Sequence, residues 1–238
     1  LYNDFSAQHL WDKNTFIQSQ YKKEFSRQWV FRTSAKWNWS YQHYLDPAIK
    51  NNEGKTENSY YQREYYLSAS VLYRLLNNLS FSLSTDGSIN TMNANMADFA
   101  HPTRYSWLTA IAGKYVNEWF TLSASALATV INEQADKGGS AGNHRKLTPY
   151  VSATFKPFRN EEFRVRFFYK DIFRLPSFND LYYQEVGNSK LKPENARQYN
   201  IGLTYSRNVC TFLPYLSATV DAYYNKVTDK IIAYPTKN

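Results

Sequence analysis

The chain contains few cysteines, which cross-link small secreted domains, and few glycines and prolines, which are abundant in flexible chains. Its 238 residues contain one cysteine, Cys210, so no disulfide can form within it, and the redox compartment is left open. Glycine and proline number only 8 each while aromatic residues make up 18%, which excludes a collagen-like or disordered chain. The sequence has no apolar run of about 18 residues, and this excludes a helical membrane protein.

The chain does carry many aromatic residues and an excess of positive charge. It has 21 tyrosines, 15 phenylalanines and a net charge of +8. A basic protein rich in aromatic residues could bind nucleic acid through phosphate contacts and base stacking. The lysines and arginines are spread along the chain without a dense cluster, so we interpret them as solvated positions and expect no nucleic-acid partner.

The dominant pattern is alternation with a period of two. Between residues 25 and 41, the odd positions are mostly aromatic or small, as at Trp37 and Trp39, and the even positions are mostly polar. The segment 61–75 repeats this pattern, which predicts strands with one apolar and one polar face. Residues 1–24 are ambiguous, with a further strand at Phe16–Tyr21 before a turn at Lys22–Glu24. The other expected strands are 79–86, 104–116, 119–132, 146–156, 162–171, 196–206 and 213–227.

Strand length and loop length together predict the fold class. Many of the strands exceed about ten residues, which is long for a globular protein and suits tilted strands that cross a membrane. Short and long connections alternate strictly, as in outer-membrane barrels with periplasmic turns and extracellular loops. We therefore predict an all-β, antiparallel transmembrane β-barrel rather than a soluble β-sandwich. The short connections are 76–78, 116–118, 157–161 and 207–212, and the long ones are 45–59, 87–103, 133–145 and 172–195.

The two faces and the strand count extend this prediction. Charged and polar side chains are costly in hydrocarbon, so the polar face is expected to line the lumen, while aromatic residues near both strand ends form two girdles at the lipid interfaces. Nine strands are clear and a tenth is possible in the ambiguous segment, whereas closed barrels have an even number of strands, and the last clear strand ends on the long-connection side with no returning strand after it. Because the chain also starts without a signal-peptide pattern, we expect residues 1–238 to be a piece of a barrel domain, without a plug domain or closing strands.

The long connection from Phe173 to Glu194 carries a family resemblance. It reads FRLPSFNDLYYQEVGNSKLKPE and, with GLTY and VDAYYNKVTDKI further on, resembles the C-terminal barrel region of TonB-dependent outer-membrane receptors. Ser177 is expected to start a helix, with Phe178, Leu181 and Tyr182 on one face. The residues that match the family pattern are Phe173, Arg174, Pro176, Asp180, Leu181, Tyr182, Gly187, Asn188, Leu191, Pro193 and Glu194.

The resemblance implies a function and a set of partners. The parent protein would be a plugged barrel of about 22 strands in the outer membrane of a Gram-negative bacterium. It would import a scarce nutrient with energy from the TonB complex, which acts through the plug. Outer-membrane lipid is a further partner, and a surface lipoprotein is an optional one. The resemblance implies neither an enzyme nor a cofactor.

The same resemblance narrows the range of possible cargoes. Similar receptors carry cobalamin, heme or iron siderophores, and DAYYNKVTDKIIAYPT is most similar to vitamin B12-type receptors of gut Bacteroidetes, so cobalamin is the expected cargo. A heme receptor of this family has a histidine within the long connection, and residues 175–187 contain none. His43, His101 and His144 lie at or near other long connections. The candidate ligand-binding residues are Arg174, Phe178, Asp180, Tyr182, Tyr183, His101 and His144, and no metal site is expected.

Several alternatives remain open from the sequence. Arg174, Pro176 and Glu194 could serve only to fold the connection against the barrel wall. The protein could also be a passive porin or a small stand-alone barrel, which requires a chain that closes within its own length. An outer-membrane hydrolase needs Ser, His and an acid that converge, and the four histidines lie in no catalytic pattern.

Overall fold

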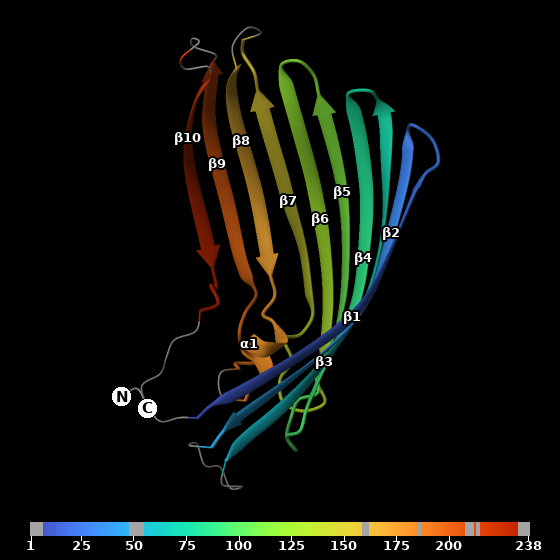
Figure 1. Ribbon diagram of the computed structural model, residues 1–238, viewed down its shortest axis with the longest axis vertical. Helices are drawn as coiled ribbons and strands as arrows, with labels where there is room; N and C mark the ends of the chain where they lie inside the picture. Colours follow the sequence, from blue (N-terminus) through green and yellow to red (C-terminus); the bar gives the residue numbers. More distant parts are fainter. Residues whose placement is uncertain are drawn as a thin grey trace.

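The alternating segments form ten long antiparallel strands and one short helix (Figure 1). The computed structural model describes residues 7–47, 55–158, 162–184, 187–207, 212 and 215–232. The elements are β1 (His9–Glu24), β2 (Trp29–Asp46), β3 (Thr56–Leu76), β4 (Leu79–Ala94), β5 (Thr103–Val116), β6 (Phe120–Gln134), β7 (His144–Phe155), β8 (Glu162–Arg174), α1 (Phe178–Tyr182), β9 (Glu194–Arg207) and β10 (Leu216–Thr228).

The strands make a single sheet in chain order, from β1 to β10. Each strand pairs only with its sequence neighbours, and β1 and β10 do not pair with each other among the described residues. The short turns lie at one end of the curved wall, and the long connections with α1 lie at the other (Figure 1). The all-β prediction is therefore confirmed, and the sheet is a partial barrel. No helix in the described segments is long and apolar enough to cross a membrane.

The two faces of the sheet differ in chemistry, as the alternation predicts. Pairing across β2, β3 and β4 places Trp37, Tyr65 and Ile89 in one row on the outer face, and this row is apolar and accessible. The opposite, inner face carries polar side chains and the helix. Gln62 Nε2 on the inner face of β3 donates to Asn179 Oδ1 of α1 at 2.8 Å. The polar face is thus the one that the long connections cover.

The turn expected at Lys22–Glu24 is wrong. These residues belong to β1, whose pairing with β2 continues to Glu24 opposite Val30. The chain turns instead at residues 25–28, where the Ser26 hydroxyl accepts from the N–H of Gln28 at 3.1 Å and from that of Trp29 at 3.2 Å. The side chain of Ser26 thus supplies the turn, whereas the charged residues before it remain paired.

The expected end of β4 at residue 86 is also wrong, because Gly87 does not break the strand. Gly87 pairs in register with Leu67 and Trp107, and β4 continues to Ala94. The Trp107 ring lies 3.6 Å from where a Gly87 Cβ would be, so a large aromatic neighbour covers the missing side chain. Most of the other strands also extend further toward the long connections than expected, so the long connections are shorter than predicted. The expected connections 157–161 and 207–212 lie partly outside the described residues.

A buried apolar cluster lies on the inner face beneath the long connections, rather than between two layers. Residues from β3, β4, the β4–β5 connection and α1 meet there. A sheet face that is polar along most of its length therefore becomes apolar where the connections fold onto it. The buried members are Tyr60, Met92, Phe99, Phe178, Leu181 and Tyr182.

Candidate functional site

The connection between β8 and β9 is ordered by a capped helical turn. Ser177 is the N-cap of α1, and its hydroxyl accepts from the N–H of Asp180 at 3.2 Å. The Asp180 carboxylate accepts in return from the N–H of Ser177 at 2.8 Å. This reciprocal pair is a capping box, which satisfies two backbone donors at once. The helix start and the shared buried face of Phe178, Leu181 and Tyr182 are both confirmed.

Loss of the cap should loosen this turn. In Ser177→Ala, the N–H of Asp180 loses its side-chain acceptor, so we expect α1 to lose about 0.5–2 kcal/mol of local stability. Native-state hydrogen exchange of the amides in 178–183 measures this as faster exchange. Ser189→Ala, in the same connection but away from the cap, is the control. Equal exchange rates in Ser177→Ala and the wild type would show that the cap does not order the turn.

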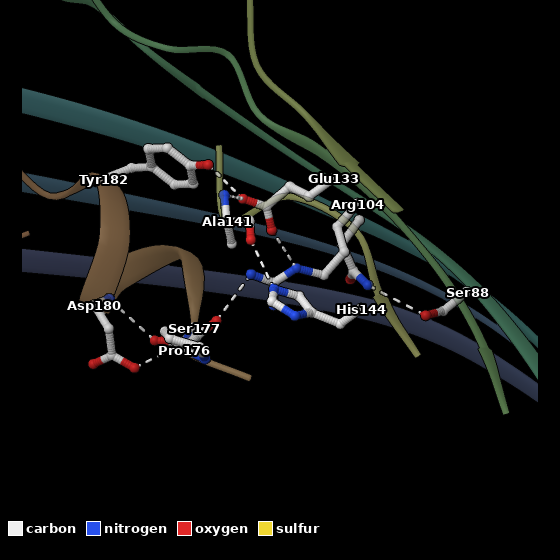
Figure 2. A network of polar contacts seen from close by, with 10 residues as sticks. Ser88, Arg104, Glu133, Ala141, His144, Pro176, Ser177, Asp180 and Tyr182 are labelled. Carbon is white, nitrogen blue, oxygen red and sulfur yellow. Dashed lines mark hydrogen bonds and ion pairs between the residues drawn. The ribbon is translucent and has the colours of Figure 1, made fainter. Parts of the chain in front are cut away.

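A buried polar network ties this connection to the inner face of β5 and β6 (Figure 2). The side chain of Glu133 is fully buried, and its Oε2 lies 2.6 Å from Nε of Arg104, whose side chain is 13% exposed. The other carboxylate oxygen accepts from the hydroxyl of Tyr182 and from the N–H of Ala141. Arg104 also donates to the carbonyl of Pro176 at 2.9 Å. One buried ion pair therefore holds both ends of α1.

The chemistry of this network favours a fixed structure over proton transfer. Burial, followed by the hydrogen bond to Glu133, raises the pKa of the Tyr182 phenol, so Tyr182 remains a neutral donor. The Arg104 guanidinium lies 4.7 Å from the centroid of the Phe178 ring, a cation–π contact that also anchors the helix. The charged and polar groups of the network therefore satisfy one another.

Beside the network, Tyr183 and Gln184 separate two hollows. The Tyr183 ring stacks on Tyr60 with centroids 4.4 Å apart, and the N–H of Gln184 donates to the Tyr60 hydroxyl at 3.2 Å. One hollow has a volume of about 320 Å³ and the other about 330 Å³. The first is lined by Leu10, Gln42, Tyr44, Asn58, Tyr60, Tyr183 and Gln184.

This first hollow combines aromatic faces with amide groups. Such a lining can hold a ligand by ring contacts and orient it by a few hydrogen bonds. Burial, together with the neighbouring Tyr60 and Asp12, raises the pKa of Tyr183 to about 12. Its hydroxyl is neutral at physiological pH and can donate to a polar group of a ligand.

The five candidate residues from the long connection fall into three groups. Phe178 and Tyr182 are buried in the packing of α1, and Tyr182 also lines the second hollow. Asp180 is used in the cap and lies 3.7 Å from Arg174, which is about half exposed and also 3.9 Å from Glu194. Tyr183 lines both hollows.

The two histidines lie apart from each other. His101 Nδ1 is 3.0 Å from Asn93 Oδ1 in the β4–β5 connection. His144 stands beside the buried network (Figure 2), and its Nε2 is 2.7 Å from the carbonyl oxygen of Ala141, whose N–H donates to Glu133. The structure therefore does not bring all seven candidates into one site. Within the described ranges, no three His, Cys, Asp or Glu side chains gather as a metal site would require.

The sequence analysis missed Tyr60, Arg104 and Glu133. All three occupy inner-face positions near the long-connection ends of their strands, and Arg104 stands directly opposite Glu133 in the pairing of β5 with β6. Once the register is known, the alternation places Arg104 and Glu133 opposite each other on the inner face, and such a charged pair indicates a buried ion pair. The register itself depends on turn geometry, which alternation alone does not determine.

Comparison with known proteins relates the sheet to one family. A family model described as "TonB dependent receptor-like, beta-barrel" matches residues 2–238. Two curated relatives are both called "Vitamin B12 transporter BtuB". The one from Vibrio vulnificus is 28% identical over 64% of this chain and 29% of its own length. The one from Photobacterium profundum is 33% identical over 28% of this chain and 10% of its own length.

Solved structures share the fold at low sequence identity. "Copper transporter OprC" aligns with a TM-score of 0.66 and 11% identity, covering 88% of this chain and 38% of that one. A siderophore receptor, PiuA from Acinetobacter baumannii, aligns with a TM-score of 0.64 and 10% identity, covering 90% and 40%. The chain thus spans less than half the length of each of these relatives and structures.

Proposed function

The chain belongs to the TonB-dependent receptor β-barrel family, and from this membership we propose that the whole protein imports a scarce nutrient with energy from the TonB complex. The family consists of receptors rather than enzymes, and its members lie in the outer membrane of Gram-negative bacteria. The chain therefore belongs to that membrane. The observation that carries the proposal is the family match along 2–238, supported by a polar inner face onto which a connection folds.

Cobalamin is the cargo that we propose. The support is the similarity to two relatives called vitamin B12 transporters, together with an aromatic and amide-lined hollow beside α1. At about 320 Å³ the hollow would hold an aromatic or amide-bearing edge of this large ligand and not the whole of it. Tyr183 and Gln184 would contact the cargo directly, with Tyr44 and Asn58 on the facing strands. Arg174, which is exposed at the start of the connection, would meet it from the rim.

The remainder of the receptor would lie in other parts of the protein. The ten strands leave β1 and β10 unpaired with each other in the described part of the chain, and the Vibrio vulnificus relative is matched over 29% of its length. We propose that a plug domain and closing strands complete the barrel. The intact mass of the natural polypeptide under denaturing conditions tests this, since 27.9 kDa accounts for this chain alone.

Uptake by whole cells tests the transport proposal. Cells that express the full-length protein should accumulate labelled cobalamin when the TonB complex is functional, and lose that uptake when it is inactivated. Hemin and a ferric siderophore, supplied in parallel, identify a different cargo. Uptake that continues without TonB would indicate a passive porin and overturn the energy-coupled import.

Substitution of Tyr183 should weaken cargo binding. Tyr183→Ala removes both the stacking partner of Tyr60 and a wall of the hollow, so we expect the Kd of the full-length receptor for cobalamin to rise about tenfold. Equilibrium titration in detergent measures this. Tyr115→Ala, at the short-turn end of β5, is the matched control and should leave the Kd unchanged. An unchanged Kd in Tyr183→Ala would remove this hollow from the cargo site.

A further inference from the structure

A third, larger hollow lies on the outer face of the sheet, away from the connections. It has a volume of about 800 Å³, and its lining includes Ile17, Trp37, Tyr65, Leu67, Ile89 and Trp107. Leu67 and Trp107 are 62% and 57% exposed. Gly87 also lines it, and the Trp107 ring lies 3.6 Å from where a Gly87 Cβ would be. A side chain larger than hydrogen at Gly87 would project from the floor, so the glycine keeps the hollow open.

The position of the hollow along the strands places it in the outer-leaflet half of the membrane. Trp37 lines the hollow at the middle of β2, and Trp29 begins β2 at the short-turn end. At about 3.3 Å per residue the two are separated by roughly 26 Å along the strand, and a strand tilt of about 40° reduces this to roughly 20 Å along the membrane normal, within an apolar band about 25 Å tall. With Trp29 at the short-turn interface, Trp37 lies beyond the middle of the band, and the hollow opens toward the outer leaflet.

Two cations stand just beyond the hollow on the same outer face. Arg63 lies two residues past Tyr65 and pairs with Trp39, and Lys13 pairs with Tyr41 in the next outward row. Both are exposed, and the Nζ of Lys13 is 6.0 Å from the Tyr41 ring centroid. No carboxylate among the described residues forms an ion pair with either one. Glu57, further along this face, pairs with Lys55 and His43.

We propose that this hollow and its two cations form a binding site for a phosphate-bearing anionic lipid of the outer leaflet. An acyl chain fills the apolar hollow, and the lipid phosphate binds between Arg63 and Lys13. The apolar lining requires a lipid rather than free phosphate, and the unpaired cations require a negative headgroup rather than a zwitterionic one. The proposal rests on the membrane location of the family and is independent of the cargo.

Brominated lipids test the site, because bromine quenches tryptophan and both Trp37 and Trp107 line the hollow. The full-length receptor is reconstituted into phosphatidylcholine bilayers that contain increasing fractions of brominated phosphatidylglycerol or, separately, brominated phosphatidylcholine. Quenching should show a preference of at least about fivefold for the anionic lipid, the effect of roughly one cation near a phosphate. The double variant Arg63→Gln/Lys13→Gln should reduce this preference to about one.

Two further variants separate the site from a general surface effect. Lys23→Gln removes a cation at the short-turn end of the strand that carries Lys13, and should keep the full preference. Gly87→Leu fills the floor of the hollow and should lower quenching by the anionic lipid while the barrel remains folded. Equal quenching by both lipids, or a preference that persists in the double variant, would overturn the proposal. Cross-linked dimers with no quenching by either lipid would show that a second copy covers this face, and would overturn it as well.

Discussion

Glu133→Ala is expected to release the β8–β9 connection from the inner face of the sheet. The substitution leaves the Arg104 guanidinium buried without its carboxylate and removes the acceptor of the Tyr182 hydroxyl. Removal of one partner of a buried ion pair typically costs about 3–5 kcal/mol. Because the network joins one connection to the sheet, this loss should appear as local opening of α1 while the strands remain paired.

Limited proteolysis and hydrogen exchange of the full-length receptor measure this opening. Amides in 177–184 should exchange about a hundredfold to several thousandfold faster in Glu133→Ala, corresponding to about 3–5 kcal/mol. Glu162→Ala is the matched control, because its carboxylate pairs with Arg164 at the exposed start of β8 and such a pair contributes at most about 1 kcal/mol. Exchange in 177–184 that is the same in both variants would mean that the connection is held by its apolar contacts alone.

Ala126→Arg should destabilise the whole barrel, because it places a charge in hydrocarbon. Ala126 lies midway along β6, in register with Ile111, whose side chain is 61% exposed on the outer face. An arginine near the bilayer midplane on this face costs about 2–4 kcal/mol. The free energy of unfolding of the full-length receptor in bilayers, obtained by denaturant titration, should fall by that amount.

Ser125→Arg is the control one residue away. Ser125 stands opposite Ala112 on the inner face. An arginine at this position enters the polar lumen, so it should change the free energy of unfolding by less than about 1 kcal/mol. The same loss in both variants would contradict the assignment of outer and inner faces.

The sequence predicts most strands of the barrel wall but few contacts of the candidate site, and β6 shows the reason. Leu122, Ala124, Ala126 and Ala128 alternate with Ser123 and Ser125, and a period of two fixes which face each residue occupies whatever the strand pairs with. Glu133 follows the same alternation, but its partners come from three other segments. Contacts of that kind depend on register and on the path of the connections, which alternation does not determine.

Helix α1 can be predicted in part from the sequence. Ser177 and Asp180 form a local motif three residues apart, so the cap could be predicted from the sequence. The buried helix face could also be predicted, and Phe178 and Tyr182 were therefore identified as important residues. Both side chains are buried beneath the connection, so they serve packing, and a contact with a ligand stays a prediction. Tyr60, which stacks on Tyr183, is 123 residues away in the chain, and no local pattern connects the two.

The most direct test of the account is the effect of cobalamin on hydrogen exchange in the full-length receptor. If the hollow beside α1 belongs to the cargo site, saturating cobalamin should slow exchange in 58–62 and 177–184. The short turn at 117–119 should exchange at an unchanged rate and serves as the internal reference. Binding of cobalamin with no added protection in either segment would contradict the placement of the cargo site, and an absence of binding would contradict the cargo itself.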